Sequence, residues 1–281
     1  MSHLSIEELR QFCEFLYGRV GIQLGESKRY FIERRLFERF ARTDSPSFNH
    51  YYQLLRTNPV EVAAVISSFT VGETYFYRED HQFRCLTDSI LPEVIKEKRP
   101  GDKIRIWSQP CSTGEEPYSI ALWLLENWRL VDAYHVEIVG SDVDGESLAT
   151  AREGRYGARS LNRLPPEVIH DYFEPLRHGT RYIIEDLRES VIYTEANLVD
   201  PVSMQANGIF DVIFCRNVLI YFDDASRARA TRNLWSCLRP GGFICLGHTE
   251  SMSRMSDLFE LRRFPSAIVY QRPPPAMAGA R

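Results

Sequence analysis

The sequence lacks long apolar runs, closely paired cysteines and an excess of positive charge. No apolar stretch approaches the ~18 residues that span a bilayer, and the opening MSHLSIEELRQ does not have the pattern of a secretion signal. We therefore expect a cytoplasmic protein without membrane insertion. The 6 cysteines form no CxxC pair, which argues against a structural zinc site or a disulfide framework, and no metal site is predicted.

The charge balance makes nucleic acid an unexpected partner. The chain has 34 Lys and Arg against 38 Asp and Glu, a formal net charge of −4, whereas duplex DNA binders normally carry a strongly basic face. Hydrophobic residues are 44% and charged residues 26%, the balance of an ordinary globular chain. Because 281 residues exceed what a single core usually supports, we expect two domains or one domain with a large insertion.

The first seventy or so residues predict only helices. Ser5 and Glu8 have the spacing of a capping box, and apolar residues then recur at helical intervals until Gly18 and Gly21 break the run. A second helix is predicted over 28–42, and two more follow before residue 70. Residues 1–72 are therefore predicted to form a small N-terminal helical domain.

After a linker and connecting helix at 73–100, the pattern changes to apolar strands that alternate with helices. The predicted strands are 103–108, 136–140, 191–195, 210–215, 243–247 and 267–271. Such alternation predicts an α/β domain over 101–272, with a doubly wound, mostly parallel, Rossmann-like sheet. The stretch between Tyr156 and Glu195 does not fit this alternation and predicts an inserted small subdomain, with its β element at about 174–195. The final residues, 273–281, have the composition of a disordered tail.

Polar residues follow several of the predicted strands, where an open parallel sheet binds its ligand. The turn after the first strand leads into Glu115 and Glu116 at a helix start, without a GxGxxG motif. Two carboxylates there repel phosphates and suit a cationic or amino-bearing ligand; the alternative is a plain loop with acids placed favourably at a helix N-terminus. Asp142 follows the next strand and can accept the hydroxyl pair of a ribose, while Asp144 is predicted to cap the following helix.

Two further strand ends carry polar side chains. Asn197 is placed to pair with a purine edge. Arg216 and Asn217 interrupt an apolar run, where burial without partners is costly, so a ligand site explains them better than packing does. An acid for a ribose, acids at a helix start and no phosphate loop together describe a site for S-adenosylmethionine, which has a ribose, an adenine and a cationic sulfonium but no phosphate.

Three motifs make a family resemblance specific. CSTGEEPYSIA, FDVIFCRNVLIYF and FTVGETYFYREDHQF resemble the chemotaxis receptor methyltransferases, the CheR family of protein-glutamate O-methyltransferases, in consistent order over about residues 5–271. The resemblance implies methyl transfer from S-adenosylmethionine to glutamates on the cytoplasmic signalling helices of methyl-accepting chemotaxis receptors. The products are glutamyl methyl esters and S-adenosylhomocysteine. The family's small inserted element also implies that the subdomain here is an antiparallel β-structure.

The resemblance also implies site residues. Tyr221 corresponds to the aromatic residue near the transferred methyl group, and Arg78 to a cofactor contact, which its charge suits to pair with the cofactor carboxylate. The implied cofactor contacts are Thr74, Arg78, Glu116, Asp142, Asn197, Leu198, Arg216 and Asn217. The family often has FTTN where this chain has FTVG, so at Gly72 only the backbone amide is left to take the place of the asparagine contact.

The second predicted helix places basic residues on one face, and the family uses this helix for substrate docking. These residues are Lys28, Arg35, Arg39 and Arg42. The alternative is a solvated surface, since three glutamates dilute the charge. Some family members also grip a receptor C-terminal pentapeptide through a longer, glycine-rich loop in the subdomain. The corresponding stretch here, 175–181, is short and has one glycine, so the pentapeptide-independent type is predicted.

Two other functions remain open from the sequence. Amino-methylating nucleic-acid enzymes carry a D/N-P-P-Y/F element after the fourth strand, where this chain has Cys215-Arg216-Asn217-Val218, and Pro110-Cys111 follows the first strand rather than the fourth. Both features, with the acidic charge balance, count against a nucleic-acid methyltransferase. A sensor or scaffold that binds S-adenosylmethionine without turnover is the second alternative, and the Tyr221 region counts against it.

Overall fold

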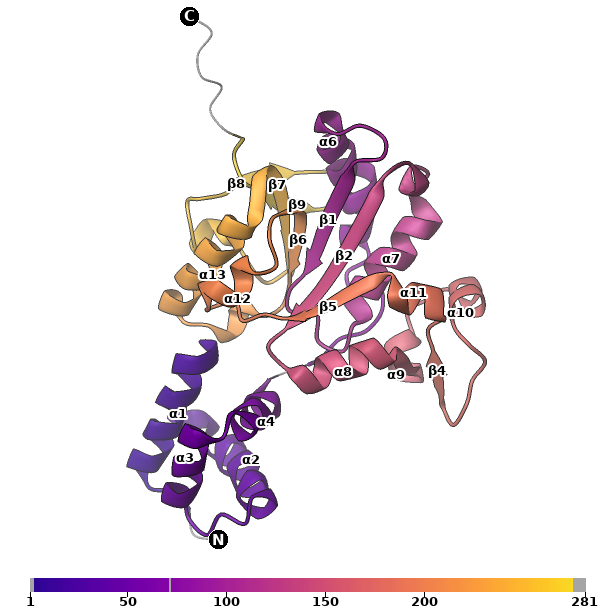
Figure 1. Ribbon diagram of the computed structural model, residues 1–281. Helices are drawn as coiled ribbons and strands as arrows, with labels where there is room; N and C mark the ends of the chain where they lie inside the picture. The colour runs from indigo at the N-terminus through magenta and orange to yellow at the C-terminus, as the bar shows by residue number, and fades with distance from the viewer. Residues whose placement is uncertain (1–2, 71, 275–281) are drawn as a thin grey trace, which may run out of the picture.

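The structure is a computed structural model that describes residues 3–70 and 72–274. It contains a helical N-terminal domain below a larger α/β domain (Figure 1). Most of the predicted disordered tail lies outside the described residues. Within them, no helix combines the length and the apolar character that crossing a bilayer requires.

The N-terminal domain begins with the predicted capping box. The Ser5 side chain accepts from the Glu8 amide, and the Glu8 carboxylate accepts from the Ser5 amide. Gly18 does not end the first helix, which continues to a left-handed Gly21 cap with φ 74°, so Gly21 alone is the break. The helical elements are α1 (Ile6–Val20), η1 (Glu26–Lys28), α2 (Arg29–Arg42), α3 (Phe48–Thr57) and α4 (Pro59–Phe69). Their apolar faces share one core, which includes Phe12, Ile32 and Tyr51.

The α/β domain confirms the predicted Rossmann-like sheet. Its seven strands have the order β5-β2-β1-β6-β7-β9-β8, and the first five are parallel. The strands are β1 (Lys103–Ser108), β2 (His135–Asp142), β5 (Val191–Glu195), β6 (Phe210–Cys215), β7 (Leu238–Leu246), β8 (Glu260–Arg263) and β9 (Ile268–Gln271). The chain runs outward from β1 to β5 on one side and from β6 to β7 on the other. The topological switch point therefore lies between β1 and β6, where such folds bind ligands.

Helices cover both faces of the sheet and bury two apolar layers. One layer packs under α7 (Glu115–Asn127) and the connecting helical segment, and the other under α13 (Asp224–Cys237). The connecting segment comprises α5 (His81–Cys85), η2 (Leu86–Ile90), α6 (Leu91–Val94) and η3 (Ile95–Glu97). The remaining elements of this domain outside the insertion are η4 (Val131–Ala133), α8 (Gly145–Glu153), α12 (Pro201–Gln205), η5 (Leu219–Tyr221) and η6 (Met252–Arg254).

The β element of the inserted subdomain has bounds different from the predicted 174–195. Its two-stranded antiparallel sheet pairs β3 (Arg155–Gly157) with β4 (Thr180–Tyr182), so it starts earlier in the chain. Val191–Glu195 instead pairs with β2 as the edge strand of the large sheet. Three short helices complete the insertion, namely α9 (Ala158–Leu161), α10 (Pro166–Tyr172) and α11 (Glu185–Glu189). A three-residue strand has too few residues to show a period in the sequence, which is why β3 was not predicted.

Candidate active site

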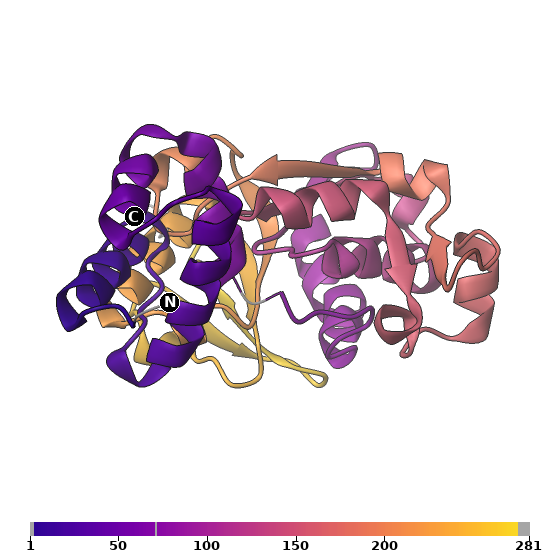
Figure 2. The same cartoon turned by 90° about the horizontal axis from the view of Figure 1, so that it is seen from below.

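Two adjoining cavities lie at the carboxyl ends of the central strands. They share a set of lining residues at their junction. The shared residues are Gly72, Pro110, Ser112, Asn217 and Tyr221. The first cavity also has Val20 and Ile22 of the N-terminal domain in its wall, so both domains enclose it. Seen from below, the N-terminal helices lie to one side of this end of the α/β domain (Figure 2).

Asp142 lies at the end of β2 and faces the first cavity. Its carboxylate accepts from the Ser112 amide at 2.8 Å and from the Asp144 amide at 3.0 Å. The side chain is only 6% exposed, and this burial raises the pKa of Asp142 to about 6 although the two amide bonds lower it. Asp144 caps α8 as predicted, since it accepts from the amides of Glu146 and Ser147.

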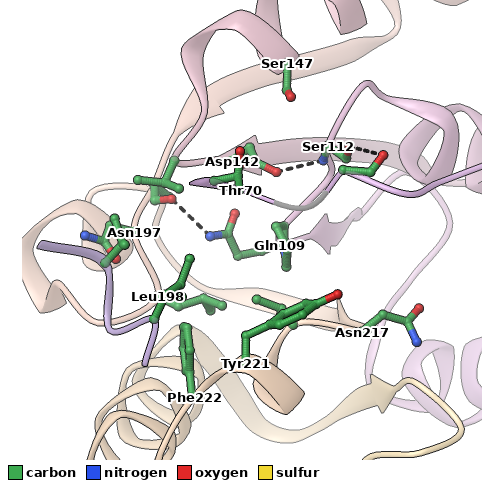
Figure 3. A pocket seen from close by; sticks show the side chains of 17 residues that line it. Thr70, Gln109, Ser112, Asp142, Ser147, Asn197, Leu198, Asn217, Tyr221 and Phe222 are labelled. Atoms are coloured by element: carbon green, nitrogen blue, oxygen red, sulfur yellow. Dashed lines mark hydrogen bonds between the residues drawn. The ribbon is translucent and has the colours of Figure 1, made fainter. Parts of the chain in front are cut away.

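The opposite wall of the first cavity is apolar. Leu198, Phe222 and the ring of Tyr221 lie across from Asp142 (Figure 3). Gln109 lies between the two walls, and its Nε2 donates to the Ala196 carbonyl at 3.1 Å. Its Oε1 is buried without a hydrogen-bond partner, which leaves an acceptor available to a ligand. Sequence reasoning missed Gln109 because a lone glutamine in a strand-end turn carries no distinctive signal.

The second cavity has a buried ionic cluster in its wall. The Arg216 guanidinium, 2% exposed, pairs with Glu116 at 2.7 Å and with Glu79 at 3.2 Å, and it donates to the Arg78 carbonyl at 2.6 Å. Burial lowers the pKa of Arg216, but the two carboxylates outweigh that effect and raise it. His248 also pairs with Glu79, at 3.0 Å. Two carboxylates facing one guanidinium leave the cluster with excess negative charge, which favours a cationic ligand.

Glu79 was not predicted as a site residue, although it belongs to the motif that contains Arg78. Thr74 and Arg78 line the second cavity as the linker enters the α/β domain. The Arg78 guanidinium donates to the Glu73 carbonyl at 2.6 Å. Arg216 is engaged by three protein groups, so its direct contact with a cofactor stays a prediction.

Asn197 and Leu198 both line the first cavity, but the Asn197 amide is engaged elsewhere. Its Nδ2 donates to the Arg19 carbonyl of the N-terminal domain at 2.7 Å, and its Oδ1 accepts from the Val199 amide at 3.2 Å. The predicted pairing of this amide with a purine therefore competes with contacts that join the two domains. The structure supports a wall-forming position for both residues.

The four predicted docking cations are not equivalent. Arg39 makes two hydrogen bonds to Glu61, at 2.9 and 2.5 Å, and its side chain is only 12% exposed. Arg35 lies 4.2 Å from the centroid of the Phe31 ring and is half-buried. Lys28 and Arg42 are exposed. The structure thus separates Arg39 from the exposed basic face, because an acid on α4 binds it within the domain.

The groups in the cleft fit S-adenosylmethionine. Asp142 offers acceptors for ribose hydroxyls, the orphaned Gln109 oxygen and the apolar wall suit an adenine, and the negative cluster suits an amino group and a sulfonium. No cluster of three or more His, Cys, Asp or Glu side chains that could hold a metal ion is found in the described part of the chain.

Comparisons with known proteins agree with this geometry. Residues 72–268 match the family described as "CheR methyltransferase, SAM binding domain", and residues 7–70 match "CheR methyltransferase, all-alpha domain". Chemotaxis protein methyltransferase 2 of Vibrio cholerae is 44% identical over 94% of this chain and 92% of that protein. Chemotaxis protein methyltransferase of Vibrio parahaemolyticus is 35% identical over 95% of this chain and 98% of that protein.

A third relative, chemotaxis protein methyltransferase 2 of Pseudomonas aeruginosa, is 36% identical over 91% of this chain and 90% of that protein. The matches cover both domains and all three motifs identified in the sequence. They do not favour a nucleic-acid methyltransferase or a sensor without turnover. The chain therefore belongs to the CheR methyltransferase family and uses S-adenosylmethionine as its cofactor.

Proposed function

We propose that this protein methylates glutamate side chains on the cytoplasmic signalling helices of chemotaxis receptors, giving glutamyl methyl esters, and that it acts in the cytoplasm. The names of its relatives support a chemotaxis substrate. The observation that carries the proposal is the two-chambered cleft, with Asp142 in one chamber, the Glu116–Arg216 pair in the other and Tyr221 at their junction.

The residues of the cleft bind and orient rather than transfer protons. When bound, S-adenosylmethionine supplies an activated methyl group on a positively charged sulfur. A glutamate carboxylate is already ionised at neutral pH, since its pKa is about 4.3, so the protein needs no general base. Tyr221 shapes the junction, where an aromatic face favours positive charge. Asp142 accepts ribose hydroxyls, Arg78 pairs with the cofactor carboxylate, and Val20 and Ile22 exclude water from the first chamber.

Exposed cations of the N-terminal domain are proposed to dock the receptor. Lys28 and Arg42 remain free of ion pairs among the described residues, and they fit an acidic helix by charge complementarity. Arg35 contributes from a half-buried position over Phe31. Arg39 has a structural role in this proposal, because Glu61 already engages it.

The subdomain is proposed to act without a receptor C-terminal pentapeptide. His178 and Gly179 both have positive φ, 49° and 77°, and form a tight turn closed by two hydrogen bonds between Arg177 and Thr180. The chain before the turn also pairs with the far side of β4. The Glu174 amide donates to the Tyr182 carbonyl at 2.8 Å, and a bridge joins Phe173 to Ile183 just after the strand. Since β3 occupies the other side of β4, an added peptide strand cannot pair with β4 itself.

The test is transfer of labelled methyl groups to a receptor cytoplasmic domain. We expect label that base releases, as an ester does, and loss of transfer when the receptor's acceptor glutamates are changed to alanine. Stable label on nucleic acid would instead support the first alternative. Cofactor binding without transfer to any receptor domain would support the sensor.

A further inference from the structure

The loop that follows β7 carries a buried carboxylate that the two cavities do not account for. Glu250 is 9% exposed and is not among the residues that line either cavity. Its Oε1 accepts from the amides of Val218 and Leu219, at 3.0 and 2.7 Å. Its Oε2 accepts from the amides of Asn217 and Gly247, at 2.8 and 2.9 Å. One side chain thus satisfies four backbone donors.

The surroundings of Glu250 are built for this carboxylate. No salt bridge joins it to any cation in the described part of the chain, so the four amide dipoles supply its stabilisation, as in a backbone anion nest. Gly247 permits the approach: a Cβ atom there would lie 2.5 Å from Asn217 Nδ2 and 2.9 Å from Glu250 Oε2. Burial raises the pKa of Glu250, an effect that the four amide bonds partly offset.

The amides that Glu250 binds belong to the segment that carries the site. Asn217, Val218 and Leu219 lie two to four positions before Tyr221, and Asn217 and Tyr221 lie at the junction of the two cavities. Asn217 has φ 59°, a left-handed conformation that is uncommon for a residue other than glycine and needs support from its surroundings. The support for these amides comes from a residue 31 to 33 positions later in the chain.

We propose that Glu250 is a positioning residue that fixes the backbone of 217–219 and thereby holds Asn217 and Tyr221 in the cleft. It touches neither cavity, so it acts through those two residues. The expected effect of Glu250 on methyl transfer to a receptor rests on the proposed function. Its fixing of the backbone of 217–219 does not, because that concerns only this chain and its cofactor site.

The test is Glu250→Gln, which nearly preserves shape and removes the charge. A carboxamide has one acceptor oxygen, so two of the four amides would face an NH₂ group instead. We expect faster hydrogen exchange at the amides of 217–219, and affinity for S-adenosylhomocysteine lower by roughly tenfold. We also expect a lower kcat for methyl transfer with a smaller change in the KM for the receptor.

Asp211→Asn is the matched control. Asp211 is 4% exposed at the start of β6, pairs with Lys98 and Arg239, and lies at the end of the strand away from the cleft. The Asp211→Asn substitution should lower the stability of the protein while leaving hydrogen exchange at 217–219 and affinity for S-adenosylhomocysteine unchanged. A merely structural role for Glu250 predicts that both variants lose global stability alike, with no local change at 217–219.

Three results would overturn the proposal. The first is that Glu250→Gln keeps the unaltered protein's affinity for S-adenosylhomocysteine and its rate of hydrogen exchange at 217–219. The second is that the Asp211→Asn control also shows faster hydrogen exchange at 217–219. If Glu250→Gln fails to fold, hydrogen exchange of the unaltered protein is the test. The third result is then that the amides of 217–219 exchange without protection in the native state, which would rule out the anchoring. Local loosening with weakened S-adenosylhomocysteine binding, in a protein that methylates no receptor, would refute the proposed function and leave the positioning role intact.

Discussion

Cofactor affinity should depend on pH through Asp142. Burial raises the pKa of this carboxyl from 3.8 to about 6, so about nine-tenths of the sites are ionised at pH 7 and about a tenth at pH 5. Both oxygens already accept backbone amides, and a proton on either would displace a donor. If the ionised form receives the ribose hydroxyls, affinity for S-adenosylhomocysteine should fall about tenfold from pH 7 to pH 5. Titration calorimetry across this range measures the fall.

The stability of the ligand-free protein provides a second readout, with the opposite sign. A raised folded-state pKa contributes stability below the unfolded value of 3.8, and this contribution is lost as the pH rises through about 6. Ionisation of Asp142 therefore lowers the free energy of unfolding by about 3 kcal/mol at neutral pH. Asp142→Asn removes that loss of stability but leaves one backbone amide without an acceptor. The free energy of unfolding should therefore rise by at most about 2 kcal/mol.

The two measurements together isolate Asp142. Burial also raises the pKa values of Glu115 and Glu250, and their contributions persist in Asp142→Asn. The variant should bind S-adenosylhomocysteine more weakly at pH 7, by ~1 to 3 kcal/mol, and should lose most of the pH dependence. Equal affinity in both proteins, or an unchanged slope between pH 5 and 7 in the variant, would refute the ribose assignment.

Other expectations concern docking and turnover. Arg39→Ala should lower the free energy of unfolding by about 3 kcal/mol, seen in urea denaturation, because it leaves the charge of Glu61 buried without a cation, with the Tyr51 hydroxyl still donating to it. Lys28→Glu with Arg42→Glu should reduce receptor methylation most at low salt and spare S-adenosylhomocysteine affinity; equal methylation would mean that this face is only solvated. Tyr221→Ala should lower kcat by about tenfold or more, whereas Tyr221→Phe keeps the ring and most of the rate, as single-turnover kinetics would show. A receptor C-terminal pentapeptide should not bind in calorimetry, and one-to-one micromolar binding would contradict that expectation.

The strands that the sequence predicts best are those with apolar runs free of glycine. The bounds of 103–108, 191–195 and 210–215 are those observed. β7 begins five residues earlier than predicted, because it passes through Pro240 and two glycines where its pairing with β6 shifts register. β8 was not predicted, since Glu-Leu-Arg-Arg at a sheet edge has little apolar content to mark it.

The site was predictable where a residue's role depends on its own strand end. Asp144 as a helix cap follows from local spacing, and the structure confirms it. Glu79 and Glu250 could not be assigned in this way, because their partners lie over a hundred and about thirty residues away. Arg39 shows the same limit: helical spacing gives its face on α2, but only the packing of α4 brings Glu61 to it.

The N-terminal domain contributes to the cofactor site, in addition to carrying the proposed docking residues. The Gln23 amide donates to the Tyr221 carbonyl at 3.3 Å, and Thr70 donates to Asp144 at 3.1 Å. Val20 and Ile22 line the first cavity from the end of α1. These contacts reach the cap of α8 and the segment that carries Tyr221, so a shift of the helical domain would alter the walls around the cofactor. A receptor that docks on the helical domain, as proposed, would therefore bind the same domain whose residues 20–23 and 70 contact the cofactor cleft.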